Sequence, residues 1–266
     1  MSRTMNKVVW LTGASSGIGE ALAYELSKKG TKLILSARRK EELERVKGNC
    51  VPSAQADIKI LPLDLEKSDT LELTTEAAIQ LFGHVDMLIN NGGISQRSFV
   101  ANTSLAVYRR LMEVNYFGAV ALTLNLLPHF IQRQKGHFVT ITSVTGLFGT
   151  PYRSGYAASK HALHGFFDSL RAEHDKDNIK VSLICPGFIR TGLSQSALTA
   201  DGTPLNKMDA SQFKGKSAEW CARKIVDAVE SNKQEVYIGG REVLGVYLKR
   251  FFPGIFSTVI RKIAVR

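Results

Sequence analysis

Short apolar segments alternate with longer helix-like segments six times along the chain, and this alternation most constrains the fold. The apolar segments are rich in Val, Ile and Leu, which is typical of strands buried on both faces of a parallel sheet. The predicted strands are residues 7–11, 32–36, 58–63, 85–89, 137–142 and 180–185, with a last strand at 235–238. The pattern predicts an α/β protein, a doubly wound Rossmann fold with a mainly parallel sheet of about seven strands.

The segments between the strands predict helices, and the whole pattern predicts one domain. The predicted helices are residues 18–29, 40–47, 67–82, 104–132, 153–174 and 217–232. We expect cofactor binding and catalysis in residues 1–240, with a polar, poorly periodic substrate loop at about 188–216. Residues 241–266 form a C-terminal basic amphipathic extension.

A glycine-rich turn, Thr-Gly-Ala-Ser-Ser-Gly-Ile-Gly, lies at residues 12–19 between the first predicted strand and the first helix. In this context glycines let the backbone approach phosphate, and the helix N-terminus supplies free N–H groups. Taken alone, the turn also fits a purely structural role. The predicted cofactor-binding residues are Gly13, Ser15, Ser16, Gly17, Ile18 and Gly19.

The end of the second strand predicts which dinucleotide binds. A fold that prefers NAD offers a carboxylate here for the ribose 2′-hydroxyl, whereas arginine suits a 2′-phosphate. Arg38 and Arg39 stand at this point without a carboxylate, which favours NADP(H). Arg39 also fits the solvated start of the next helix. Asp64 either accepts from an adenine amino group or caps the following helix. Further predicted cofactor contacts are Leu65, Asn91 and Gly92.

Tyr156 and Lys160 are four residues apart in the predicted helix 153–174 and therefore share a face. An ammonium beside a phenol lowers a pKa of roughly 10 toward the working pH, which makes the tyrosine a general acid or base. Ser143 follows a predicted strand at the sheet edge where ligands bind, so it can hydrogen-bond a substrate oxygen that Tyr156 protonates. The same residues also fit an ordinary surface pair.

Several motifs in this order resemble the short-chain dehydrogenase/reductase family over roughly residues 7–240. The matching residues are Thr12, Gly13, Gly17, Gly19, Asn90, Asn91, Gly93, Asn115, Ser143, Tyr156, Lys160, Pro186 and Gly187. Gly92 departs from the alanine that is usual there. Within the family, the chain resembles most the membrane-associated group that includes the 11β-hydroxysteroid dehydrogenase type 1-like and DHRS7-like proteins.

The resemblance implies hydride transfer between a nicotinamide and a carbonyl or alcohol carbon. It implies that Tyr156 exchanges the proton, Ser143 polarises the oxygen, and Lys160 lowers the tyrosine pKa and binds the nicotinamide ribose. Asn115 would hold a water beside Lys160, a role compatible with bracing the neighbouring backbone. The implied cofactor contacts also include Tyr156, Lys160, Pro186, Gly187, Ile189 and Thr191. The candidate substrate residues are Ser95, Ser143, Thr145, Tyr152, Tyr156 and Leu193, whose apolar neighbours indicate a lipophilic alcohol or ketone.

The net charge and the cysteine content limit which partners and which cellular compartment we expect. A formal net charge of +11 calls for anionic partners, and the scattered basic residues favour a phosphate-bearing cofactor and a membrane surface over nucleic acid. Three widely spaced cysteines without a CxxC pair indicate a reducing compartment and no metal site. The N-terminus runs directly into the first strand, so we expect a cytoplasmic protein.

The C-terminal extension leaves two roles open. Its apolar residues fall on one helical face and its basic residues on the other, which suits either the surface of an anionic membrane or a contact between subunits. The residues of the apolar face are Ile255, Phe256, Val259, Ile260 and Ile263. We expect a homodimer or homotetramer. The alternative function is a catalytically silent NADP-binding sensor or a membrane-recruited scaffold.

Overall fold

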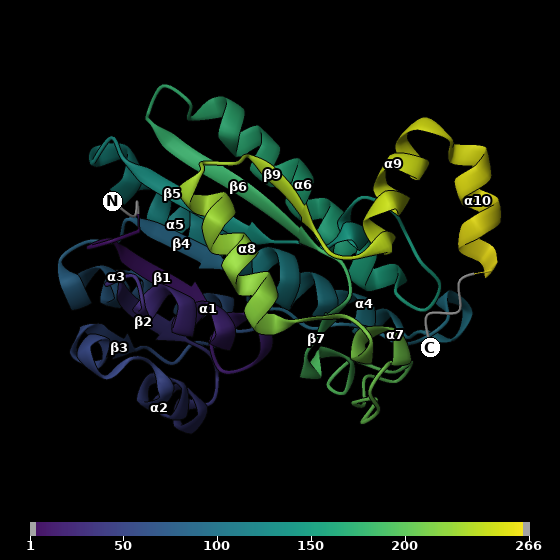
Figure 1. Cartoon of the computed structure of the whole chain (residues 1–266), viewed down its shortest axis with the longest axis horizontal. Coiled ribbons are helices and arrows are strands. Elements are labelled where there is room, and N and C mark those ends of the chain that lie inside the picture. The colour runs from purple at the N-terminus through teal and green to yellow at the C-terminus, as the bar shows by residue number, and fades with distance from the viewer. Residues whose placement is uncertain (1–3, 263–266) are drawn as a thin grey trace.

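A computed structural model describes residues 4–262 and has a seven-stranded sheet at its centre (Figure 1). The strand order is β3-β2-β1-β4-β5-β6-β9, and every neighbouring pair is parallel. The strands are β1 (Val8–Thr12), β2 (Lys32–Ser36), β3 (Ile58–Ile60), β4 (Met87–Asn90), β5 (Gly136–Ile141), β6 (Ile179–Pro186) and β9 (Glu235–Ile238), with β7 (Ile189–Arg190) and β8 (Lys216–Ser217) forming a separate pair. The predicted fold class is confirmed.

Helices cover both faces of the sheet. One face is covered by α1 (Gly17–Ser27), α2 (Lys40–Asn49) and α8 (Ala218–Glu230). The other is covered by α3 (Leu71–Phe82), α5 (Gly118–Gln132) and α6 (Ser154–Glu173), with α4 (Leu105–Met112) beside α6. The short α7 (Ala210–Phe213) lies in the predicted substrate loop, while α9 (Leu244–Phe251) and α10 (Pro253–Lys262) form a hairpin that projects from the layers (Figure 1).

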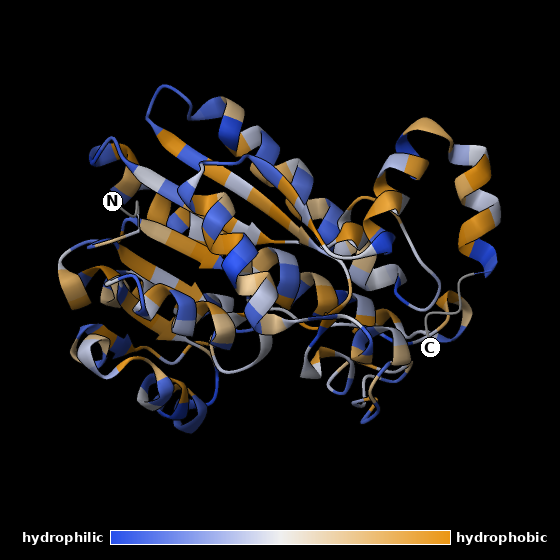
Figure 2. Ribbon diagram, in the orientation of Figure 1, coloured by the Kyte–Doolittle hydropathy of each residue, from blue (hydrophilic) through white to orange (hydrophobic). Residues whose placement is uncertain are grey.

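Alternate residues of the central strands supply the two halves of the core. In β1, Val9 and Leu11 face the α1 and α8 side, whereas Val8 and Trp10 face the α3, α5 and α6 side, and all four are fully buried. The apolar strands stand out between more polar helix surfaces (Figure 2). The strand order reverses between β1 and β4, which makes the carboxyl edge there the binding crevice typical of doubly wound sheets.

Two predicted elements differ from the structure. The predicted strand 58–63 ends at Ile60, although the backbone N–H groups of Leu61 and Leu63 still donate to the carbonyl oxygens of Leu35 and Ala37 at 3.0 and 3.1 Å. The predicted helix 104–132 contains one π-helical turn, Glu113–Phe117, between α4 and α5. The span Leu105–Gln132 is long and apolar enough to cross a membrane by length and composition, yet Leu122 and Phe130 of this span are fully buried against the sheet.

Candidate active site

The glycine-rich turn lies at the carboxyl edge between β1 and α1. Gly13 and Gly17 have φ values of +63° and +58°, a conformation that glycine adopts without strain. A Cβ on Gly19 would lie 2.1 Å from the carbonyl oxygen of Gly13, so a side chain there would force the turn apart. Ser16 precedes α1 without capping it through its side chain, which leaves the first N–H groups of α1 for a phosphate. Ser15 and Ile18 belong to the same turn.

Asn91 ties this turn to the end of β4. Its Nδ2 donates to the carbonyl oxygens of Thr12 and Gly13 at 3.0 and 3.1 Å. The backbone N–H groups of Asn91 and Gly92 both donate to Thr12 Oγ1 at 3.0 Å. A Cβ on Gly92 would lie 2.6 Å from Leu65 Cδ1, so glycine lets Leu65 close over the strand end. These contacts join the glycine turn to the end of β4 at the point where the strand order reverses.

The predicted adenosine-side residues lie at the neighbouring strand ends. Arg38 and Arg39 follow β2, both are exposed, and neither guanidinium has a hydrogen-bond or ion-pair partner within residues 4–262. Asp64 Oδ1 accepts a 3.2 Å bond from the backbone N–H of Glu66. Helix α3 begins only at Leu71, so the alternative that Asp64 caps this helix is wrong. An adenine contact of Asp64 stays a prediction.

The segment after β6 returns to the glycine turn. Pro186 ends β6, and Gly187 lines the cavity described below. Ile189 is buried in the core beside α1 and α8. A Cβ on Gly17 would lie 3.1 Å from Cγ2 of Thr191, so the structure brings Thr191 against the predicted phosphate-binding turn.

The predicted catalytic residues meet at the carboxyl end of β5. Tyr156 and Lys160 project from the first turns of α6 and are both buried. Lys160 Nζ lies 5.9 Å from the centroid of the Tyr156 ring. The hydroxyl of Ser143 accepts bonds from Thr145 N and Thr145 Oγ1 at 3.2 and 2.9 Å, and donates a long 3.3 Å bond to the carbonyl oxygen of Pro186. The weak donor bond leaves the Ser143 proton easy to redirect to a substrate oxygen.

Asn115 braces the backbone at the end of β4. In the π-helical turn its Oδ1 accepts from Ile94 N at 2.8 Å, and its Nδ2 donates to Ile94 O and to Ser159 Oγ, each at 2.9 Å. A π turn inserts one residue into the helix, which aims this amide sideways at the neighbouring segment. The bracing alternative is therefore confirmed, and a water-holding role of Asn115 stays a prediction.

Burial controls the pKa values of the site. It raises the pKa of Tyr156 above its ordinary value, and the Arg153 cation and the Ser143 hydroxyl oppose this shift. Burial also lowers the pKa of Lys160 to about 8. Arg153, rather than Lys160 as predicted, is the main cation that favours the Tyr156 phenolate in this structure. The protonated phenol is thus the stable form near neutral pH, as a general acid requires.

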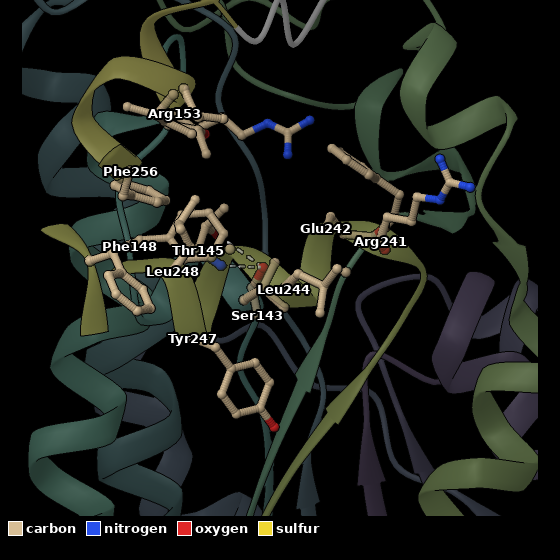
Figure 3. A pocket seen from close by; sticks show the side chains of 18 of the residues that line it. Ser143, Thr145, Phe148, Arg153, Arg241, Glu242, Leu244, Tyr247, Leu248 and Phe256 are labelled. Atoms are coloured by element: carbon tan, nitrogen blue, oxygen red, sulfur yellow. Dashed lines mark hydrogen bonds between the residues drawn. The ribbon is translucent and has the colours of Figure 1, made fainter. Parts of the chain in front are cut away.

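A cavity of about 570 Å³ opens beside Ser143 (Figure 3). Figure 3 shows Phe148 and Phe256 on one side of it, Glu242 on the other, and Ser143 between them. Eleven of its lining residues, from Arg241 to Ile260, belong to the C-terminal segment. The predicted substrate residues Ser143 and Thr145 line it, whereas Ser95, Tyr152, Tyr156 and Leu193 do not.

The predicted C-terminal extension therefore forms a wall of the cavity. Phe256 of α10 is buried and packs on Phe148, with ring centroids 5.2 Å apart. Val246 and Ile260 join the same apolar cluster. Val259 lines the cavity although it is partly exposed, whereas Ile255 is exposed and is not in the lining, so the predicted apolar face is divided between the cavity and the surface. Ile263 lies outside the described residues.

A buried cluster of charged and polar residues beside Tyr156 was not predicted. Gln96 Oε1 accepts from Gly155 N at 2.7 Å and so positions the start of α6. Arg97 and Arg153 both form ion pairs with Asp209, which lies in the predicted substrate loop. In the sequence, this cluster is marked only by the polar pair Gln96-Arg97 just beyond the Asn-Asn-Gly-Gly motif. Neighbouring residues do not indicate that Arg97 pairs with Asp209.

Comparisons with known proteins agree with this geometry. A family described as short chain dehydrogenase matches residues 7–202. Dehydrogenase/reductase SDR family member 7 of Homo sapiens is 45% identical over 251 residues, which cover 92% of this chain and 74% of that protein. Dehydrogenase/reductase SDR family member 7B of Mus musculus is 40% identical over 259 residues, covering 96% of this chain and 80% of that protein.

Solved structures show the same fold. A short-chain dehydrogenase from Streptomyces avermitilis superposes with a TM-score of 0.79 at 26% identity, covering 96% of this chain and 94% of its own. A short-chain dehydrogenase/reductase from Burkholderia phymatum, solved in complex with NAD, superposes with a TM-score of 0.82 at 24% identity, covering 94% and 95%.

Proposed function

The chain belongs to the short-chain dehydrogenase/reductase family, and from this membership we propose that it is an NADP(H)-dependent oxidoreductase that interconverts a carbonyl and an alcohol on a lipophilic substrate. One observation carries the proposal: Ser143 and the apolar cavity meet at the carboxyl edge of the sheet, where Tyr156 and Lys160 are buried alongside. A cavity of about 570 Å³ with many aromatic lining residues suits a steroid-like, retinoid-like or aliphatic compound.

The bound nicotinamide would supply or accept the hydride. Ser143 would donate a hydrogen bond to the substrate oxygen, which polarises the carbonyl and fixes its position. Tyr156 would give its phenolic proton to the same oxygen, a step favoured because burial keeps the phenol protonated. Lys160, held at the end of β5, would bind the ribose beside the nicotinamide. Because the Tyr156 phenol is protonated and ready to donate, we propose that the enzyme works in the direction of carbonyl reduction.

The preference for NADP(H) follows from charge. Arg38 and Arg39 are exposed, and their guanidinium groups have no ion-pair or hydrogen-bond partner in the described part of the chain. They stand at the end of β2, where the adenosine ribose binds in a doubly wound fold. Planar guanidinium groups bind phosphate through two parallel hydrogen bonds. The glycine turn and the uncapped start of α1 fit the pyrophosphate.

The decisive experiment is an NADPH-oxidation screen over ketosteroids, retinoids, aliphatic ketones and quinones. We expect turnover of at least one class, and we expect Tyr156→Phe to remove it while NADPH binding, followed by fluorescence, persists. A Tyr156→Phe protein that turns over its substrate at the wild-type rate would exclude the mechanism. NADPH binding without turnover of any class would favour the alternative, a silent sensor or scaffold.

The proposal extends to location and assembly. Large apolar side chains are exposed around the α9–α10 hairpin, among them Phe251, Phe252 and Ile255. The basic side chains of Lys249 and Arg250 lie beside them, a combination that suits an anionic bilayer surface facing the cytoplasm.

A second exposed apolar pair suits a contact between subunits. Phe117, which ends the π turn, and Leu124 of α5 are both exposed and lie two helical turns apart on one side of the helix. We propose that this face pairs in a homodimer or homotetramer. Light scattering should give a mass above that of one chain, and a strictly monomeric protein would exclude the proposal.

A further inference from the structure

Arg153 brings a cation to the lining of an otherwise largely apolar cavity. It stands immediately before α6, three residues ahead of Tyr156, and lines the cavity together with Ser143 (Figure 3). The residue is 7% exposed. A cation so deeply buried is costly unless a charged partner or a ligand compensates it.

The protein compensates this cation only in part. Arg153 Nη2 donates to Asp209 Oδ2 at 3.0 Å, but the same oxygen also accepts two bonds from Arg97. Arg97 has further acceptors, Ser95 Oγ and the carbonyl oxygen of Gln96. Two guanidinium groups therefore share one carboxylate, and the group of three carries one net positive charge.

The guanidinium of Arg153 also lacks acceptors. A guanidinium has five N–H donors, and within residues 4–262 the Nη2 bond to Asp209 is its one hydrogen bond, with Nε buried and unpartnered. Thr150 Oγ1, in the same lining, is likewise buried and unpartnered. Arg241 and Glu242 also line the cavity, but their opposite charges cancel, and Glu242 already accepts from Phe188 N and Gly240 N.

The backbone ahead of α6 holds Arg153 in this position. Tyr152 has a φ of +68°, in the left-handed region that bulky residues rarely adopt. Its carbonyl oxygen accepts from Ser98 N at 3.1 Å, and the centroid of its ring lies 4.2 Å from the centroid of the Phe99 ring. Arg153 itself lies over the Phe188 ring at 5.5 Å from its centroid. A strained turn fixed from several sides keeps the cation in the cavity wall.

We propose that this end of the cavity binds an anionic oxygen group, so that the substrate is a lipophilic carbonyl compound that also carries a carboxylate. The apolar wall of Phe148 and Phe256 covers the hydrocarbon part, Ser143 binds the reacting carbonyl, and Arg153 binds the carboxylate. The inference rests on the proposed carbonyl reduction and assigns Arg153 to substrate specificity. Burial and the neighbouring Arg97 cation lower the pKa of Arg153 to about 10. This agrees with a charge that Asp209 compensates only in part.

The turnover test compares medium-chain oxo acids, with the ketone at increasing distance from the carboxylate, against their methyl esters in the presence of NADPH. We expect at least one acid to exceed its ester in kcat/KM by about 10- to 100-fold, because hydrogen bonds to charged groups are strong when buried. Arg153→Gln should raise KM for the acid and abolish this preference; because Arg153 also acts on the pKa of Tyr156, any change in kcat should be shared by acid and ester, and the ratio of their kcat/KM values is the readout. Arg153→Lys should keep most of it.

A matched control separates recognition from stability. Arg97→Lys alters the second side chain paired with Asp209 but keeps the net positive charge of the group, and Arg97 does not line the cavity. This variant should keep the preference for the acid. Equal losses for acid and ester in Arg153→Gln, or wild-type protein that prefers the ester, would overturn the proposal.

Calorimetry keeps the inference distinct from the proposed function. Decanoate should bind the protein with NADP⁺ about 10-fold or more tightly than decan-1-ol, and Arg153→Gln should equalise the two. If no carbonyl is reduced but this difference is found, the anion site stands and the proposed reaction fails. If carbonyls are reduced but decanoate binds no better than decan-1-ol, the anion site is refuted and the reaction stands.

Discussion

The ammonium of Lys160 donates a 2.9 Å hydrogen bond to the carbonyl oxygen of Ile141, the last residue of β5. A carbonyl is a dipole and does not neutralise a cation, so burial lowers the pKa of Lys160 from 10.5 to about 8. This contact holds the ammonium at the strand end where the ribose of a nicotinamide cofactor would lie.

The buried Lys160 predicts how stability changes with pH. The unfolded lysine keeps its proton up to about pH 10.5 and the folded one loses it near pH 8, so the unfolded state binds more protons between these values and stability rises with pH. Lys160→Met should reduce the gain in unfolding free energy between roughly pH 7 and 9.5 by about 2 kcal/mol. Urea denaturation at each pH gives the free energy of unfolding of both proteins, and Lys40→Met, which replaces an exposed lysine, is the control. Equal gains in wild type and Lys160→Met would contradict it.

The hydroxyl of Ser143 predicts a loss of catalysis rather than of binding. Ser143→Ala removes the donor to the substrate oxygen, so kcat should fall by about 100- to 1,000-fold with KM little changed. Thr145→Val removes one donor to Ser143 and should cost much less. Steady-state kinetics on a substrate from the screen provide the measurement. A kcat within a few-fold of wild type in Ser143→Ala would exclude this role.

The arginines after β2 predict the cofactor preference. Replacing Arg38 and Arg39 with Gln should lower the ratio of kcat/KM for NADPH to that for NADH by about 10-fold or more, because each lost bond is charge-assisted. Lys40→Gln, an exposed neighbour at the start of α2, should leave the ratio near that of the wild type. An unchanged ratio in the double variant would place the 2′-phosphate elsewhere.

The contact between Phe256 and Phe148 predicts that α10 closes the cavity. Phe256→Ala removes a buried ring that packs on Phe148 at 5.2 Å, a loss of about 3 kcal/mol or more in a packed core. Hydrogen exchange should then speed up in α9 and α10 but not in the sheet, and KM for a lipophilic substrate should rise. The neighbouring Ile255→Ala is the control, since Ile255 is 56% exposed.

The exposed aromatic residues of the hairpin predict binding to anionic vesicles. Phe251 and Phe252 are 67% and 58% exposed, and replacing both with Ser should remove most of the protein from floated vesicles that contain phosphatidylserine. Vesicles of phosphatidylcholine alone should bind the wild type weakly. Wild-type protein that stays with the soluble fraction on both vesicles would leave the hairpin as a cavity wall without a membrane role.

The sequence by itself determined the sheet, the glycine turn and the positions of the candidate catalytic residues. Strand and helix periodicity are local properties, and the residues at strand ends follow from them because parallel strands place their carboxyl ends on one edge. The positions of Gly13, Ser143 and Tyr156 needed no knowledge of distant packing. Asn115 was found from the family resemblance, although the π turn that aims its amide was not, since it depends on the packing around α4 and α5.

Only the tertiary structure decided what surrounds Tyr156. Asp209 lies 112 residues from Arg97 and 56 from Arg153, and no spacing rule joins charges so far apart. Likewise, the C-terminal residues carry an amphipathic pattern that fits a membrane, a subunit or the chain's own core equally well, because periodicity says which side is apolar and not what covers it. In the structure, Phe256 packs on Phe148, so part of the apolar face is covered by the chain's own core. This contact forms one wall of the cavity beside Ser143.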